Sequence, residues 1–184
     1  MHRVILPHHK QLSNYIHSYN EFILNRLKLE DFEDMIIPDA LADIWIIKGD
    51  DLLFSFDNKS FKSLPKKNVW GLFNKKLYLK SKGITKVFSI KIHPFIFNIF
   101  FNFSLKKIIN SYENIQLCFT KDEQKFINNI IDSDFSISII ENYFLEKISA
   151  NKINESLFEV YLNLKKSRAN KNNRIVQKIR CKQT

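Results

Sequence analysis

The chain is short of the residues that several common kinds of site require. Only three of its 184 residues are glycine, which excludes a glycine-rich phosphate-binding loop. Its two cysteines, Cys118 and Cys181, belong to no CxxC or zinc-type spacing, so both are expected to be free thiols in a reducing compartment. The longest apolar stretch, residues 88–103, contains a lysine, a histidine and two asparagines and is too polar for a membrane span. Because the start is also unlike a signal peptide, a cytoplasmic location is expected.

Metal sites and catalytic groups are not indicated either. His8 and His9 would point to opposite sides of a strand, and His93 lies at the boundary of an element, so no histidine pair shares a strand face. No serine or cysteine occupies a nucleophile elbow, and the acidic pair Asp50 and Asp51 falls in a turn-like segment. The sequence therefore predicts no metal, no cofactor and no enzymatic activity.

Positive charge is concentrated near the end of the chain. Residues 147–184 contain ten Lys or Arg and two Glu, so this segment carries +8 of the formal net charge of +10. A basic terminus suits an approach to nucleic-acid phosphates, and the residues expected to contact phosphate are Arg174, Lys178 and Arg180. The alternative is an ordinary solvated surface, in a chain whose default surface charge is lysine.

The first half of the sequence alternates with a period of two. After a short helix predicted at residues 11–19, strand-like runs separated by turn signals follow at residues 21–25, 34–37, 43–47, 51–56, 69–73, 76–81 and 85–92. In the last run Phe88, Ile90 and Ile92 are expected on the face opposite Val87, Ser89 and Lys91. Short antiparallel strands of this kind favour a barrel or a sandwich.

The second half reads as helical. Pro94 is suited to start a helix through Phe103, Thr120 and Glu123 form a capping-box pair, and Asp134 is placed to cap a helix with a buried apolar side. Further helices are expected beyond residue 155. The predicted class is α+β, with an antiparallel β-barrel or sandwich (1–92), a helical bundle packed on it (93–150) and a basic helical segment (151–184).

The segment IIPDALADIWII, residues 36–47, interrupts an apolar run with two acids. Asp39 follows Pro38 and is expected in a hairpin turn, where its carboxylate bonds the backbone two residues on. Asp43 lies in the strand after this turn. It faces either the interior, as a ligand or pairing group, or the solvent as an edge charge, and the solvent-facing position is favoured here.

The order of these landmarks resembles the N-terminal sensor module of AraC-type bacterial transcription regulators. LSNYIHSY (12–19) is similar to the family's LxxYIxSY-like opening, IIPDALADIWII to its PDG..D strand pair, and FSIKIHPFIFNIFF (88–101) to its strand that ends in proline and leads into a helix. The resemblance covers about residues 12–148. Ala40 departs from it, because the family usually has a glycine there that tolerates a positive φ.

The resemblance implies a cupin-like barrel or sandwich that senses a small-molecule effector or mediates homodimerisation. A helical DNA-binding domain with two helix-turn-helix units would follow. Residues 155–167 and 172–184 look like its first helices, but the base-reading helix should begin beyond Thr184. The helix-turn-helix segment is therefore incomplete. Sequence-specific DNA binding is expected only through the C-terminal domain that is missing. The alternatives are a free-standing cupin-like carrier or enzyme, and a nonspecific nucleic-acid binder.

Four aromatic residues are the predicted lining of a ligand pocket. They are Tyr19, Trp45, Trp70 and Phe88, since small-molecule sites are usually apolar with a few polar groups. Core packing is the alternative for each one. Trp45 alternates with Ile44 and Ile46 and is expected on the other face of its strand.

Overall fold

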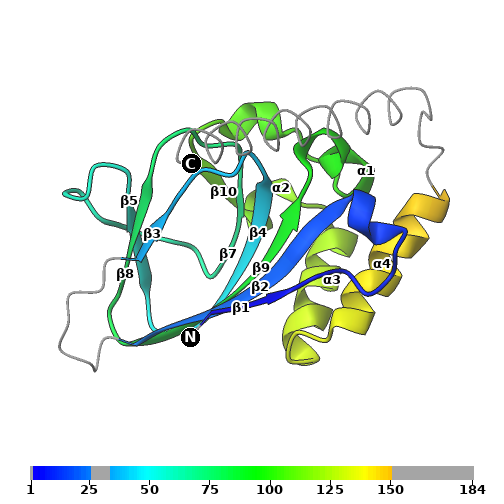
Figure 1. Cartoon of the computed structure of the whole chain (residues 1–184), viewed down its shortest axis with the longest axis horizontal. Helices are drawn as coiled ribbons and strands as arrows, with labels where there is room; N and C mark the ends of the chain where they lie inside the picture. Colours follow the sequence, from blue (N-terminus) through cyan, green and yellow to red (C-terminus); the bar gives the residue numbers. More distant parts are fainter. Residues whose placement is uncertain (1, 26–33, 151–184) are drawn as a thin grey trace, which may run out of the picture. The chain divides into compact units, whose positions relative to one another are not determined.

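The computed structural model describes residues 2–25 and 34–150, which form an α+β structure (Figure 1). The strands are β1 (His2–Ile5), β2 (Ile16–Asn25), β3 (Asp34–Ile36), β4 (Ala42–Gly49), β5 (Leu52–Ser55), β6 (Lys62–Ser63), β7 (Lys67–Trp70), β8 (Leu77–Ser81), β9 (Ile84–Ile92) and β10 (Tyr112–Asn114). The α-helices are α1 (Phe97–Phe100), α2 (Ile115–Cys118), α3 (Lys121–Asp132) and α4 (Ile137–Ala150), and the 3-10 turns are η1 (Leu12–Asn14), η2 (Pro94–Ile96) and η3 (Leu105–Ile108).

The strands form two antiparallel sheets. One has six strands in the order β1-β2-β9-β4-β7-β10, and the other has four in the order β3-β8-β5-β6. The sheets do not close into a barrel, because no strand of one pairs with a strand of the other among the described residues. The barrel predicted as one form of the fold is therefore wrong. Two sheets that face each other across an apolar core are what the described residues show.

The two faces of the six-stranded sheet meet different neighbours. Phe88 of β9 stacks on Phe135, which lies between α3 and α4, with ring centroids 4.8 Å apart. Val87 points the other way, into the apolar cluster between the sheets. The predicted alternation along β9 is thus confirmed. Figure 1 shows α3 and α4 on the side of β2 and β9 away from β5 and β8.

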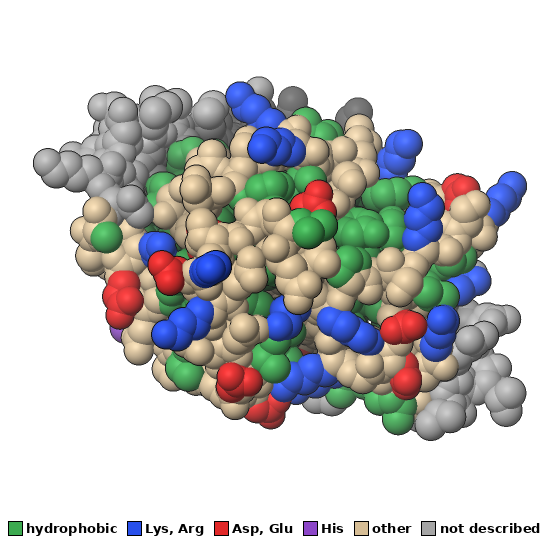
Figure 2. All heavy atoms as spheres, turned by 180° about the vertical axis from the view of Figure 1, so that it is seen from behind, with side chains coloured by type: hydrophobic (Ala, Val, Ile, Leu, Met, Phe, Trp, Pro, Cys, Tyr) green, Lys and Arg blue, Asp and Glu red, His purple; other side chains and the backbone are tan. Residues whose placement is uncertain are grey.

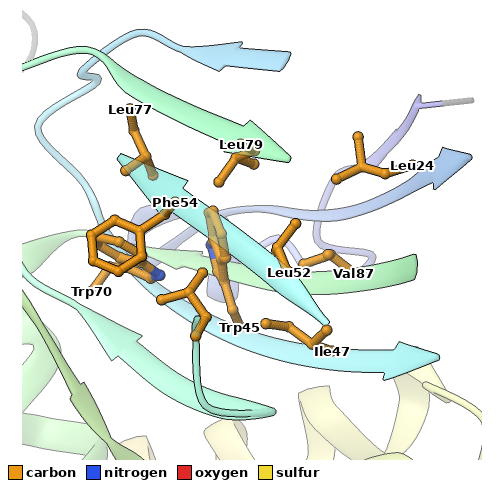
Figure 3. Packing of buried hydrophobic residues seen from close by; sticks show 10 residues of the cluster. Leu24, Trp45, Ile47, Leu52, Phe54, Trp70, Leu77, Leu79 and Val87 are labelled. Atoms are coloured by element: carbon orange, nitrogen blue, oxygen red, sulfur yellow. The ribbon is translucent and has the colours of Figure 1, made fainter. Parts of the chain in front are cut away.

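The core between the sheets is built around aromatic side chains. Trp45 of β4 and Trp70 of β7 lie 5.3 Å apart, and Phe54 of β5 meets Trp70 edge-on at 5.4 Å. Figure 3 shows Trp45 extending from its strand toward Leu79 of the other sheet. Burying each such side chain contributes about 1.5–3 kcal/mol, and aromatic pairs add about 0.5–1.5 kcal/mol. This cluster holds the sheets together.

One predicted helix is wrong. Within residues 11–19 the helical structure is limited to the three-residue 3-10 turn η1. The strand β2 already begins at Ile16. A β-bulge between Ile16 and Ser18 breaks the register with β9, so that Ile16 is paired with Ile92 and Ser18 with Lys91. The extra residue, His17, allows Ile16 and Ser18 to lie on opposite faces of the sheet. The apolar spacing of three and four residues that predicted a helix is therefore produced here by a short turn and a bulged strand.

The helical predictions for residues 93–150 are confirmed in part. η2 and α1 follow Pro94 but end at Phe100, earlier than expected. The capping box at the start of α3 is present, with the Thr120 side chain accepting from the Glu123 amide and the Glu123 side chain accepting from the Thr120 amide. Asp134 instead accepts a hydrogen bond from Lys48 Nζ at 3.2 Å. With α1 and α2 only four residues long, a helical bundle stays a prediction.

Several predictions fall on the end of the chain. Residues 151–184, the proposed helix-turn-helix segment with Arg174, Lys178 and Arg180, lie outside the described residues. On the face drawn in Figure 2, Lys and Arg side chains lie scattered among acidic ones instead of forming one basic patch. Within the described ranges, no helix has both the length and the apolarity to cross a membrane.

Candidate functional site

A cavity of about 340 Å³ lies between the two sheets. This volume is at the lower end of small-molecule sites, which are about 300–1,000 Å³. The six-stranded sheet provides one wall with polar side chains, whereas Met35, Ile36 and Leu79 of the smaller sheet provide an apolar wall. The cavity is therefore polar on one side and apolar on the other, as expected for a site that orients a ligand.

The polar wall is centred on an aspartate and a lysine. Asp43 of β4 and Lys91 of β9 are direct partners in the register of the sheet, and Lys91 Nζ lies 3.9 Å from Asp43 Oδ2. Lys91 also forms a short ion pair with Asp39 of the preceding turn. Asp43 is only 7% exposed, so the prediction that it faces solvent is wrong.

Sequence reasoning failed at Asp43 because β4 is buried on both faces. Ala42, Ile44 and Ile46 pack on the helical side, while Trp45 and Ile47 face the other sheet. Such a strand reads as a continuous apolar run, in which alternation no longer distinguishes inside from outside.

Burial dominates the electrostatics of this site. Removal from water raises the pKa of Asp43 from its ordinary value of 3.8 to about 7, although the Lys91 ammonium acts in the opposite direction. Burial also disfavours the charged form of Lys91, but the two nearby carboxylates raise its pKa overall. Lys91 therefore stays charged, and Asp43 titrates near neutrality.

The same wall contains buried polar atoms without partners. Asp43 Oδ1 and Trp45 Nε1 are shielded from solvent and make no hydrogen bond. Deeper in the core, Trp70 Nε1 and Asn68 Oδ1 are also unpaired. A buried polar group left unsatisfied costs about 1–3 kcal/mol, so native proteins usually pair such atoms. Although no hydrogen bond of ordinary length and angle reaches Asp43 Oδ1, the Trp45 indole and the Ser89 hydroxyl lie close enough to its carboxylate to lower its pKa, so the three groups form one polar cluster in the cavity wall.

The bulge in β2 completes the polar wall. After the bulge the strand alternates regularly, so Ser18 lies on the same face as Asn20, two residues on. Asn20 Nδ2 donates to Ser18 Oγ at 3.2 Å and to Ser89 Oγ of β9 at 3.3 Å. Asn20 and Ser89 both line the cavity, so three adjacent strands, β2, β9 and β4, each supply it with polar groups.

The turn before β4 positions the carboxylates. Asp39 Oδ1 accepts from the Leu41 amide at 3.1 Å, which confirms the predicted bond to the backbone two residues on. Ala40 adopts φ of 59°, in the left-handed region that favours glycine. The turn thus has a backbone conformation that is usual for glycine, although alanine occupies this position. This conformation holds the Asp39 carboxylate against the Lys91 ammonium group.

The structure separates the four predicted ligand-binding residues. Trp45 lines the cavity, and Trp70 packs beside it in the core. Tyr19 and Phe88 lie on the opposite face of the sheet, where Tyr19 Oη donates to Glu141 Oε1 at 3.5 Å and Phe88 stacks on Phe135. The pKa of Tyr19 is raised by burial and by the adjacent Glu141 carboxylate.

Trp45 is the one predicted ligand residue that lines the cavity, and the other ten lining residues were absent from the predicted site, among them the polar residues Asn20, Asp43, Ser89 and Lys91. A signal for the central pair was present in the sequence, since opposite charges interrupt two apolar strands predicted to belong to one sheet. Among residues 2–25 and 34–150, no three or more His, Cys, Asp or Glu side chains gather in a way that would hold a metal ion.

The model of one protein family matches residues 3–114 of the chain, and its description is a domain of unknown function, DUF6597. The match covers more than half of the 184 residues, so the chain belongs to this family. It includes both sheets in full apart from the first residue of β1, and every cavity residue except His2. No curated protein and no solved structure matches the chain.

Proposed function

We propose that this chain is the effector-sensing part of an AraC-type transcription regulator and that its effector binds in the cavity between the sheets. The observation that carries this proposal is the cavity itself, whose wall brings the charged pair Asp43 and Lys91 together with Trp45 and Ser89. A molecule that binds there, and that binds only the folded chain, would stabilise it.

The residues that carry the resemblance to AraC-type sensors also build the site. IIPDALADIWII supplies Asp39, Asp43 and Trp45, and the strand that leads into Pro94 supplies Ser89 and Lys91. In this proposal the two facing sheets correspond to the sandwich form of a cupin-like sensor, and α3 and α4 to the start of its helical part. Homodimerisation and control of DNA binding belong to the same proposal.

A thermal-shift screen against metabolites tests ligand binding. Ligands are expected to raise the melting temperature of the chain, and the substitution Ser89→Leu, which fills the cavity, should remove the shift. Ser138→Leu on α4, away from the cavity, is the matched control and should keep it. If no compound shifts the melting temperature, or if shifts persist in Ser89→Leu, the cavity is not an effector site.

The link to transcription needs a separate measurement. The complete chain can be fused to a DNA-binding domain of known operator, and reporter output measured with and without a ligand from the screen. A ligand-dependent change of output is expected of a sensor module. Binding with unchanged output would instead support the free-standing carrier.

A further inference from the structure

Among the described residues around the cavity, the charges do not balance. Lys91 is the ammonium group that these residues bring to the polar wall, and it is shared by two carboxylates, those of Asp39 and Asp43. Asp39 takes the short hydrogen bond from Lys91 Nζ, whereas Asp43 Oδ2 is 3.9 Å from it. His2, which also lines the cavity, is exposed. When Asp43 is ionised, the described part of this wall therefore has an excess of negative charge.

We propose that the cavity binds a cation, namely a protonated amine carried on a flat apolar body, with the ammonium group against Asp43. This inference rests on the proposed function, since it names the class of effector for the same site. An ammonium group has only donors, and the atoms it would meet are the Asp43 carboxylate, the hydroxyl of Ser89 and the amide oxygen of Asn20, whose nitrogen is used by Ser18 and Ser89.

The apolar surfaces fit the rest of such a molecule. Trp45 and Phe22 lie 5.8 Å apart in an edge-to-face arrangement, and both line the cavity beside Asp43. A tryptophan ring attracts a nearby cation more strongly than other aromatic rings do. Met35 and Leu79 on the facing sheet would cover the apolar body. The ligand is thus oriented with its charge toward β4 and its body toward β3 and β8.

Anions and neutral molecules fit this wall less well. An anion would have to bind Lys91, which already holds two carboxylates, and would be repelled by Asp43. A neutral molecule would leave the negative excess uncompensated. The geometry thus separates three classes of ligand by charge.

A series of three probes with similar bodies tests the inference: 2-phenylethylamine, 2-phenylethanol and 3-phenylpropanoate. Binding to the complete chain is measured at pH 8 by calorimetry and by tryptophan fluorescence. The amine is expected to bind at least about tenfold more tightly than the other two, and Asp43→Asn to weaken it at least about tenfold. Asp51→Asn is the matched control, because it removes a carboxylate that pairs with Lys66 and Lys82 and does not line the cavity, and it is expected to weaken binding less than about threefold.

The outcomes separate this inference from the proposed function. Tighter binding of the alcohol or the carboxylate, or amine binding that Asp43→Asn leaves unchanged, overturns the amine class. Failure of all three probes overturns it as well. If the metabolite screen still yields a ligand that Ser89→Leu abolishes, the effector site stands; if the screen yields none, both proposals fall. A cooperative thermal transition in each variant shows that loss of binding is not loss of folding.

Discussion

Replacing Asp43 with asparagine is expected to stabilise the protein at alkaline pH. The carboxyl group binds its proton more tightly in the folded chain, where its pKa is about 7, than in the unfolded chain, where the pKa is about 3.8. Ionisation therefore penalises the folded state, and the penalty is complete above about pH 8. Since one pKa unit corresponds to about 1.4 kcal/mol, the ionised carboxylate costs up to about 4 kcal/mol. Asparagine has nearly the same shape and no charge to desolvate.

The pH dependence distinguishes this effect from a change in packing. Protonation removes the penalty as the pH falls from 8 toward 4, so the advantage of Asp43→Asn should shrink from up to about 4 kcal/mol at pH 8 to about 1 kcal/mol at pH 4.5. The groups that face Asp43 are the Lys91 ammonium, the Asp39 carboxylate, the Trp45 indole and the Ser89 hydroxyl.

Urea unfolding followed by circular dichroism at both pH values provides the measurement, with Asp39→Asn as control. Asp39 is partly exposed, so removing its charge is expected to change stability by less than about 1 kcal/mol. If Asp43→Asn is less stable than the parent at pH 8, Asp43 is a structural partner of Lys91. An equal difference at both pH values would likewise refute the desolvation argument.

Three further substitutions test the fold around the site by thermal melting. Ala40→Gly is expected to raise stability by about 0.5–1 kcal/mol, because glycine accepts the positive φ at a small entropic cost; a lower melting temperature would contradict this. Gly71→Ala should lower stability by about 2 kcal/mol or more, since the added Cβ would overlap the Ile108 carbonyl oxygen; an unchanged melting temperature would show that η3 moves freely. Glu123→Gln should cost about 2 kcal/mol, because the carboxylate accepts from the amides of Asn102 and Thr120 and an amide has one oxygen; retained stability would mean that water replaces the lost bond.

The sequence predicted the elements whose signals are local. The capping box of α3 depends on residues three positions apart, and the seven predicted strands are all present, because turns and period-two patterns mark them. Strands β1, β6 and β10 were missed, as they span two to four residues and depend on a partner strand. Whether the sheets closed into a barrel depended on pairing between distant segments, which no local pattern records.

The site was predicted only in part, for a related reason. Trp45 was identified because it alternates with Ile44 and Ile46. The orientation of Asp43 depends on its register with Lys91, and those residues are far apart in the sequence. The bulge after Ile16, which leaves Ile16 and Ser18 on opposite faces of the sheet, likewise has no clear local signal. The register between distant strands therefore decided which polar residues meet.

Two unfavourable features occur three residues apart beside this site, the left-handed backbone of Ala40 and the desolvated carboxylate of Asp43. Positive φ at one other non-glycine residue, Phe135, has a local explanation. Phe135 adopts φ of 66°, but its ring stacks on Phe88 and lies 4.3 Å from Lys48 Nζ, and these contacts offset the strain. The Ala40 side chain is exposed, so packing offers it no such compensation. Local rules that are broken without compensation are characteristic of functional sites, and here a single substitution at either position is expected to stabilise the chain. The effector site that we propose between the two sheets would account for stability given up at the turn and at the carboxylate that follows it.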